Sequence, residues 1–457
     1  MTNTCPAWRR LFYWFITRVY FARITILNPE RRPRKGPVLY LGLHRNGAVD
    51  GFVYNQALGG PTFLISTQLT KSWFARLFFT GIEVTRSKDE GDRAGNELAL
   101  QACVELLHRG GALFVFPEGT SSLGPRHLPF KTGALWLILD YLEKHGPGLN
   151  VVPVGIHYEC PWAFRAKVEV VLGDPLDLRS IGVSAKKDFS EFDPASGPGV
   201  AAASSTARVE TGHAVAAKPA SEVTLTKLRA LKRMAQAGLE AVGINVVSAE
   251  YQTEIQKLAY VSTLATPRSC FASLKALERD IPKPILDDGK ALEAQLASCR
   301  LWLHQGVPLV PMGSILLYIL ALLISAPLVL AAGILNAPAL MAGYWAGKRF
   351  PDDLNVVSLW KILVGLPVFI LWAGVVCALC ACTAKTLWLF SYVALTWIGL
   401  HLYYRVKKLA VAVHNGLLYP KLRPAMLRFR EIVLSNMPSA PLEIPRNGGQ
   451  RKGREIE

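Results

Sequence analysis

The chain has 457 residues, of which 51% are hydrophobic, and 51 Lys and Arg against 34 Asp and Glu give a formal net charge of +17. This length leaves room for more than one domain. The charge suits an anionic partner, namely nucleic acid, an acidic lipid surface or a phosphorylated substrate. Because hydrophobic residues crowd between about 309 and 404, the sequence favours a membrane and excludes nucleic acid as the leading interpretation. The eight cysteines show no disulfide-like framework, and the CxxC spacing among Cys377, Cys380 and Cys382 lies inside an apolar run, which favours packing over a zinc site.

The first 36 residues are basic and aromatic. Between Trp8 and Leu27, aromatic and aliphatic side chains are interrupted by arginines, and further basic residues follow up to Lys35. The segment lacks the uninterrupted apolar centre of a secretory signal, so we expect it to stay on the protein. Residues 1–36 are predicted to form an amphipathic membrane-associated helix and a basic segment. The alternative is a helix that packs on the globular domain.

Residues 37–183 alternate between strand-like and helix-like pieces. Patterns of helical period lie near 71–79, 92–109 and 131–145, and short apolar runs between them predict strands. The predicted strands are Val38–Leu43, Thr62–Ser66, Ile82–Thr85, Ala112–Phe116, Val151–Ile156 and Lys167–Leu172. Such alternation predicts an α/β domain, a sheet flanked by helices. Ligands of these folds gather at strand ends, and the reactive side chains of this segment fall there.

The first predicted strand leads to His44, and Asp50 follows it across an Asn46-Gly47 turn. Histidine is readily poised as a base near neutral pH, and a carboxylate on its other ring nitrogen fixes the tautomer and stabilises the imidazolium. A single pair of this kind also occurs in an ordinary turn with a solvated aspartate. The remaining strand ends decide between these two interpretations.

Two further strand ends suit a substrate that is both anionic and apolar. Arg86 closes the stretch Gly81-Ile-Glu-Val-Thr-Arg and offers a planar fork to a phosphate or carboxylate. The strand Val151-Val-Pro-Val-Gly-Ile is almost wholly apolar and could wall a slot for a hydrocarbon chain. Taken singly, Arg86 is typical of a surface ion pair and Val-Pro-Val of an edge strand.

The most informative strand end is Phe-Pro-Glu-Gly-Thr-Ser at residues 116–121. Glu118 can accept hydrogen bonds from hydroxyl groups, and Gly119 lets the backbone approach a ligand closely. Lys131 opens the following helix, where an anion would also meet free N–H groups. Each feature has an ordinary structural reading alone, and their order and spacing make the functional case.

These four stretches, in this order, resemble the motifs of the glycerolipid acyltransferases, membrane enzymes that acylate glycerol-3-phosphate or lysophosphatidate. The resemblance covers roughly residues 35 to 175. One departure lies in the first motif, where the family usually has one residue fewer between histidine and aspartate than the five found here, Arg45 to Val49. Members that resemble the fungal glycerol-3-phosphate acyltransferases share the longer spacing, which points to that branch. Gly47 can absorb the additional residue because glycine tolerates unusual backbone geometry.

The resemblance implies roles for these residues. His44 would be the general base at the acceptor hydroxyl, with Asp50 orienting it; no Gly-x-Ser-x-Gly motif supports a serine acyl-enzyme. The residues implied to hold the phosphate and glycerol parts of the acceptor are Arg86, Glu118, Gly119, Thr120 and Lys131, and those implied to wall the acyl slot are Val152, Pro153 and Val154. The donor would be an acyl thioester, either acyl-CoA or an acyl-carrier protein. Because a thioester reacts without metal assistance, no metal or other cofactor is expected.

The middle of the chain carries no evident chemistry. Residues 184–222 are rich in Ala, Ser, Gly and Pro and predict a flexible linker. Residues 223–306 show leucines about three apart with charges between them, which predicts a helical region. We interpret it as a helical cap on the catalytic domain or a surface for a partner.

Residues 307–404 are predicted to form transmembrane hairpins. The block at 309–346 fits either a re-entrant pair or one long tilted span, and the block at 362–404 is long enough for two spans. Basic residues flank both blocks, so the catalytic domain of an integral membrane protein is expected on the cytoplasmic face. Residues 405–457 are predicted to be a basic tail, disordered over its last ~20 residues.

The predicted function is transfer of an acyl chain from a thioester to the hydroxyl of glycerol-3-phosphate in phospholipid biosynthesis. The first alternative keeps the chemistry but uses lysophosphatidate or another lysophospholipid as acceptor. The second, of another class, is a non-catalytic lipid-binding or scaffold protein, which the complete set of motif residues argues against. The expected partners are the acceptor, the acyl thioester and a lipid bilayer, with no nucleic acid.

Overall fold

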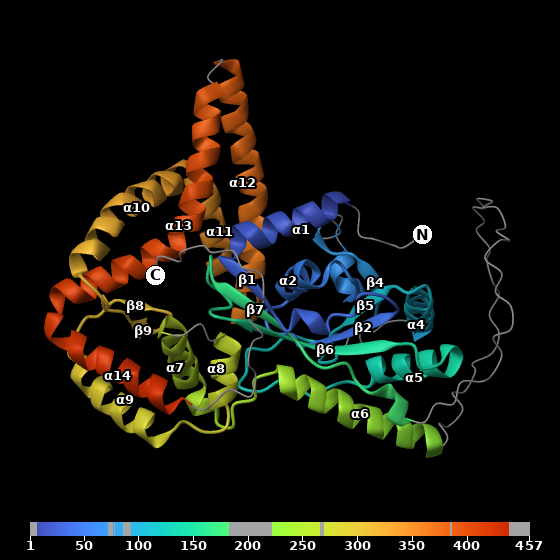
Figure 1. Ribbon diagram of the computed structural model, residues 1–457. Coiled ribbons are helices and arrows are strands. Elements are labelled where there is room, and N and C mark those ends of the chain that lie inside the picture. Colours follow the sequence, from blue (N-terminus) through green and yellow to red (C-terminus); the bar gives the residue numbers. More distant parts are fainter. Residues whose placement is uncertain are drawn as a thin grey trace.

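A mixed sheet with helices on both faces occupies the amino-terminal part of the molecule, and a helical region with long apolar helices follows it (Figure 1). The predicted fold class, an α/β domain followed by helices and apolar carboxy-terminal helices, is confirmed. This computed structural model describes residues 7–71, 76, 78–85, 93–181, 222–265, 269–383 and 386–437.

Within the described ranges, a seven-stranded sheet has the order β1, β7, β6, β2, β5, β3, β4. The bounds are Arg23–Leu27 for β1, Val38–Gly42 for β2, Thr62–Ser66 for β3, Gly81–Val84 for β4, Ala112–Val115 for β5, Asn150–Tyr158 for β6 and Lys167–Leu172 for β7. The central strands β6, β2, β5, β3 and β4 run parallel, whereas β7 is antiparallel to β6 and parallel to β1. All six predicted strands are present, and the carboxyl ends of the five that run parallel, all except β7, meet at one edge of the sheet.

The amino-terminal helix is shorter than predicted. Helix α1 spans Ala7–Tyr20, and Arg23–Leu27 is an edge strand instead of helix. The strand has three consecutive β-branched residues, Ile24, Thr25 and Ile26, which favour an extended conformation once β7 offers hydrogen-bond partners. The end of α1 is fixed by Arg165, whose Nη1 donates to the carbonyl oxygens of Arg18 and Phe21 at 2.6 and 2.7 Å. The amphipathic helix predicted within residues 1–36 therefore ends at Tyr20, and a strand follows it.

Helix α1 has two different apolar faces. Tyr13 and Ile16 are buried against the domain, so the predicted alternative of a packed helix is what the structure contains. On the other face, Trp8 and Leu11 are 54% and 64% exposed. An exposed apolar face on a helix with basic residues is typical of the membrane interface, so the two readings of this helix are compatible.

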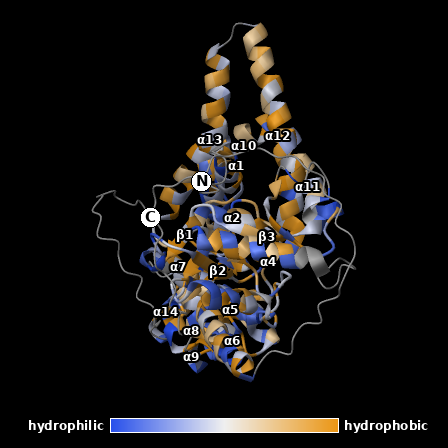
Figure 2. Cartoon of the chain, turned by 90° about the vertical axis from the view of Figure 1, so that its right-hand side faces the viewer, coloured by the Kyte–Doolittle hydropathy of each residue, from blue (hydrophilic) through white to orange (hydrophobic). Residues whose placement is uncertain are grey.

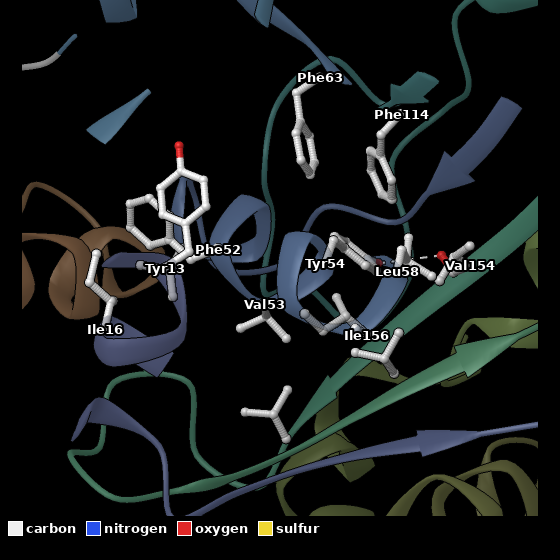
Figure 3. Close-up of a cluster of buried hydrophobic side chains, with 14 of the residues drawn as sticks. Tyr13, Ile16, Phe52, Val53, Tyr54, Leu58, Phe63, Phe114, Val154 and Ile156 are labelled. Carbon is white, nitrogen blue, oxygen red and sulfur yellow. Dashed lines mark hydrogen bonds between the residues drawn. The ribbon is translucent and has the colours of Figure 1, made fainter. Parts of the chain in front are cut away.

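Two hydrophobic cores lie on opposite faces of the sheet. Alternation along β2 sends Tyr40 to one core and Leu39 and Leu41 to the other. The first core lies under α1, α2 and α12, and the second under α4, α5 and α6. These helices span Val49–Leu58 (α2), Arg93–His108 (α4), Gly133–His145 (α5), Glu222–Val242 (α6) and Val357–Cys382 (α12). Figure 3 shows the first core around Tyr54, whose hydroxyl donates to the carbonyl oxygen of Val154 at 3.4 Å.

The region after the sheet is helical, as predicted, apart from a two-stranded ribbon. Its elements are α7 (Gln252–Ala265), α8 (Cys270–Leu277), α9 (Lys283–Leu296), β8 (Leu303–His304) and β9 (Val307–Pro308). Most of the predicted linker at 184–222 and the last 20 residues, 438–457, lie outside the described residues. The division of the chain into domains stays a prediction.

The predicted basic tail, residues 405–457, is helical over most of its described part. Helix α13 spans Thr386–Leu418 and continues well past the apolar block, and α14 (Arg423–Asn436) packs on α7 and α9. Met426 and Val433 are spaced by two helical turns and bury one face of α14. The sequence prediction of this segment rested on its many basic residues and therefore missed this apolar face.

In the part of the chain that the structure describes, three helices are long and apolar enough to cross a membrane by length and composition: Ile315–Leu335 (α10), Leu354–Cys382 (α12 with its preceding turn) and Thr386–Leu418 (α13). The short helix α11 (Ala337–Arg349) completes the first apolar block, and its 13 residues are too few to span a bilayer core of ~30 Å. Helix α10 packs along α13, and α11 packs along α12. The apolar lengths of α12 and α13 extend beyond the rest of the molecule (Figure 2).

Candidate active site

His44 lies two residues beyond the end of β2, at the sheet edge where the parallel strands end. Its imidazole stacks on Phe116, which lies just beyond β5, with ring centroids 4.0 Å apart. The residue is 9% exposed, and Glu118 accepts a hydrogen bond from its backbone N–H. Neighbouring strands and their following turns thus fix both the backbone and the ring of His44.

The predicted partner of His44 is in place. Nδ1 of His44 lies 2.9 Å from Oδ2 of Asp50, which is fully buried in the first turn of α2. Gly47 has a φ of 52°, a left-handed conformation that glycine adopts without strain, so the turn accommodates the longer spacing. The amide N–H groups of Arg45 and Asn46 donate to the same Oδ2 at 2.6 and 2.8 Å. The additional residue of the first motif therefore does not separate the pair.

This geometry fixes the tautomer of His44. A carboxylate can only accept, so Nδ1 carries the hydrogen and Nε2 presents its lone pair. Among the described residues, no group hydrogen bonds to Nε2, and the ring lines two cavities. Nε2 can therefore accept a proton from a hydroxyl group that enters either cavity.

Both cavities are walled mainly by apolar side chains and meet at His44 and Phe116, which line both; the second also has Lys131 in its lining. The first, about 570 Å³, is walled mainly by apolar side chains of α1, α2, β3 and the start of α12. The second, about 410 Å³, is lined by Gly119, Lys131 and the first residues of α5. A lysine beside a helix N-terminus suits an anion, and an apolar cavity suits a hydrocarbon chain. The arrangement can bring two such groups together at one imidazole.

Gly119 and Lys131 are brought together as predicted, and Thr120 lines the first cavity instead of the second. Gly119 has a φ of 71°, and a Cβ at this position would lie 2.6 Å from Nζ of Lys131. The missing side chain thus makes room for the lysine. Arg86, the other predicted phosphate ligand, lies outside the described residues; Thr85, immediately before it, lines the second cavity.

Glu118 is placed differently from its predicted substrate contact. It is 2% exposed and lines neither cavity. Its Oε1 accepts from the backbone N–H of His44 at 2.8 Å, and its Oε2 accepts from that of Leu128 at 2.9 Å. Burial raises the pKa of this carboxyl group, and the two N–H donors oppose that shift. Glu118 joins the loop that carries His44 to the loop that precedes Lys131.

The predicted acyl-slot wall lies elsewhere. Val152 and Val154 are fully buried in the first core and line neither cavity. Pro153 faces the opposite side of the sheet, where a Cβ on Gly238 of α6 would lie 2.8 Å from its Cγ. Because β6 is a central strand covered by helices on both faces, its middle residues line neither of the two cavities. The structure does not bring these three residues to the site.

Comparison with known proteins identifies the part of the chain that holds this site. Residues 23–157 match the family model described as Acyltransferase. These residues, less than half of the chain, therefore resemble an acyltransferase domain. The matched acyltransferase domain contains every site residue predicted from the sequence.

Individual relatives match the chain over short segments. The chain is 36% identical over 73 residues to an uncharacterized acyltransferase of Schizosaccharomyces pombe, covering 16% of this chain and 11% of that protein. It is 36% identical over 85 residues to glycerol-3-phosphate O-acyltransferase 1 of Saccharomyces cerevisiae, covering 17% and 11%. The crystal structure of a 1-acyl-sn-glycerophosphate acyltransferase from Thermotoga maritima is similar at 20% identity over 39% of this chain and 73% of that chain. The TM-score between the two structures is 0.28.

One side chain of the site was missed in the sequence. Tyr158, one residue beyond the matched acyltransferase domain, donates its hydroxyl hydrogen to Oδ1 of Asp50 at 2.6 Å. Burial, reinforced by the charge of Asp50, raises the pKa of this hydroxyl well above its ordinary value, so it stays a donor. Tyr158 lies on the same face of β6 as Val152, Val154 and Ile156. This alternation along the strand is the sequence signal that could have placed Tyr158 on the side of the sheet that carries Asp50.

Proposed function

We propose that this chain is a membrane-bound enzyme that transfers an acyl chain from a thioester to the hydroxyl of glycerol-3-phosphate, in phospholipid biosynthesis. The observation that carries the proposal is the ring of His44, held by buried Asp50 and placed where an apolar cavity meets one with a lysine and a helix N-terminus. The acceptor is chosen from the five-residue spacing of the first motif and from the named activity of the Saccharomyces cerevisiae relative.

In the proposed reaction, Nε2 of His44 accepts the hydroxyl proton of the acceptor while the hydroxyl oxygen attacks the thioester carbonyl carbon. The tetrahedral intermediate collapses, the carbon–sulfur bond breaks, and the leaving thiolate takes the proton from the imidazolium. Asp50 stabilises the imidazolium between these two steps. The reaction is balanced without a metal or cofactor, with acyl-CoA or an acyl-carrier protein as donor.

The substrates are assigned to the two cavities by their chemistry. Lys131 and the first turn of α5 would bind the phosphate of the acceptor in the second cavity, with Arg86 as a further ligand. Gly119 would allow close approach of the glycerol part. The acyl chain would lie in the first cavity, against aromatic side chains such as Phe52 and Phe63.

The membrane location rests on three apolar helices and on the exposed aromatic face of α1. Lys361 of α12 donates from Nζ to the carbonyl oxygen of Trp162 at 2.8 Å, and Lys348 and Arg349 lie in the last turn of α11, which packs along α12. Positive charge collects on the cytoplasmic side of membrane proteins. We therefore propose an integral membrane protein with its catalytic domain in the cytoplasm.

The test is acyl transfer by detergent-purified protein from a long-chain acyl-CoA to glycerol-3-phosphate and, separately, to lysophosphatidate. We expect 1-acylglycerol-3-phosphate to form with a kcat/KM at least about tenfold above that for lysophosphatidate, because a factor of ten needs only ~1.4 kcal/mol of differential transition-state binding. A preference for lysophosphatidate would overturn the choice of acceptor. Transfer to neither acceptor, with acyl-CoA or acyl-carrier protein as donor, would overturn the enzymatic proposal.

Tyr158→Phe is expected to lower kcat about tenfold with little change in the KM of either substrate. The variant removes one hydrogen bond to the Asp50 carboxylate, and hydrogen bonds to charged groups contribute about 1.5–3 kcal/mol. Because Tyr158 acts through Asp50, the loss should appear in the chemical step, which single-turnover kinetics isolates. Tyr141→Phe, on the opposite face of the sheet in α5, is the matched control. A kcat for Tyr158→Phe equal to that of the control would exclude the positioning role.

A further inference from the structure

The first cavity is closed by residues that lie far outside the acyltransferase domain. Val356 and Leu359, at the start of α12, line it together with Tyr13 of α1 and Phe52 of α2. More than 300 residues separate them from His44, which lines the same cavity. One wall of the candidate active site is therefore the beginning of a helix that could cross a membrane.

Specific hydrogen bonds hold this wall against the domain. The hydroxyl of Ser358, which is fully buried, accepts from Tyr20 at 2.9 Å and donates to the carbonyl oxygen of Pro161 at 2.5 Å. Asn355 donates from Nδ2 to the carbonyl oxygen of Ser121, in the loop that follows Glu118. These bonds tie α12 to α1 and to two loops beside His44, so its position relative to the imidazole is fixed.

The same helix is packed on one side and bare on the other. Ile362 and Leu366 are buried in the first core, whereas Leu371, farther along α12, is 71% exposed. Trp8 and Leu11 of α1 are likewise exposed. The first cavity thus lies between two helices that pack on the domain and present apolar side chains outward, where the hydrocarbon of a bilayer would meet them.

We propose that the first turn of α12 is a specificity-determining wall for a hydrocarbon chain, with Leu359 and Val356 limiting how much of the chain the first cavity holds. The inference rests on the proposed acyl transfer at His44. The chain could belong to the acyl donor or to a lysophospholipid acceptor, since both have the same chemistry. In either case the chain reaches the cavity from the bilayer side, between α1 and α12.

Leu359→Trp tests the wall by filling part of the cavity. Purified wild-type and variant proteins are assayed with acyl-CoAs from octanoyl to stearoyl at fixed glycerol-3-phosphate, and then with lysophosphatidates of different chain length at one fixed donor. We expect the ratio of kcat/KM for long over short chains to fall in one arm, roughly fourfold for each methylene group excluded. A fall of this ratio in the acyl-CoA series would place the acyl donor in the cavity. A fall in the lysophosphatidate series would place the lysophospholipid there.

Leu371→Trp is the matched control, since it makes the same change on the outward face of α12. Leu359→Ala tests the same wall without introducing a bulky side chain that could prevent folding. Because it enlarges the cavity, it should shift the preference toward longer chains. Unchanged chain-length ratios in both Leu359 variants would overturn the inference. Labelling with a photoreactive fatty acyl probe tests the wall without turnover. Labelling at residues 356–359 that Leu359→Trp suppresses would support the proposed wall, and no labelling there would contradict it. Wild-type protein that is labelled there but transfers no acyl group would contradict the proposed function alone.

Discussion

Replacement of His44 by glutamine is expected to lower kcat for acyl transfer by about 10²–10⁴-fold, the contribution typical of a positioned general base. Glutamine retains a polar side chain of similar reach but cannot accept the hydroxyl proton. The free energy of unfolding should change by about 1 kcal/mol or less, because the backbone N–H of residue 44 can still donate to Glu118. Initial rates at saturating substrates and thermal unfolding in detergent measure the two quantities separately.

His108→Gln is the control for this variant. His108 lies in the last turn of α4, stacks on His145 and lines neither cavity. Its substitution should leave kcat unchanged. If His44→Gln retained the wild-type kcat while the protein stayed folded, His44 could not be the base, and the pair with Asp50 would be structural.

Glu118→Ala is expected to reduce the free energy of unfolding by about 2–6 kcal/mol and to abolish most activity. The substitution leaves two backbone N–H donors, those of His44 and Leu128, without their acceptor, and each unsatisfied buried donor costs about 1–3 kcal/mol. The loops that carry His44 and Lys131 lose their common anchor. Chemical denaturation of the purified protein gives the stability change, and acyl-transfer rates at a temperature where the variant is folded give the effect on the site.

The same variant separates two roles for Glu118. A glutamate that bound the glycerol hydroxyls would raise the KM for glycerol-3-phosphate when removed and would leave stability unchanged. Glu118→Gln, which keeps one acceptor oxygen, should lose about half as much stability as Glu118→Ala. Glu105→Ala removes an exposed ion pair with Arg109 on α4, worth ~0–1 kcal/mol, and serves as the control. A stable Glu118→Ala protein with a raised KM would favour the substrate contact predicted from the sequence.

Much of the fold could be predicted because its signals are local. Alternating apolar residues gave six of the strands within two residues of their ends, and parallel strands put His44 and the loop at 116–121 at one edge of the sheet. The pairing of His44 with Asp50 is also local, since the turn between them is short. Side chains held by their own strand and turn are therefore the part of a site that a sequence can reveal.

The parts that were missed depend on contacts between distant segments. Nothing near Glu118 in the sequence shows that its oxygens meet two backbone N–H groups, because those groups arrive from loops at 44 and 128. The segment of β1 was predicted as helix because β7, which supplies its hydrogen-bond partners, lies about 140 residues later in the chain. Val152 and Val154 appeared suited to line a slot, but a central strand covered on both faces leaves them no access to one. In each of these examples, the position of the residue depends on contacts with segments that are distant in the sequence.

The placement of Val356 and Leu359 on the wall of the first cavity has a consequence for the order of biosynthesis. During translation, the whole acyltransferase domain leaves the ribosome some 200 residues before this wall is made. Until α12 is synthesised and docks through Ser358, the cavity beside His44 stays open on one side. The site can therefore be complete only in a chain whose first apolar helix, α10, has already been synthesised. Completion of the candidate site is in this way tied to synthesis of the apolar helices.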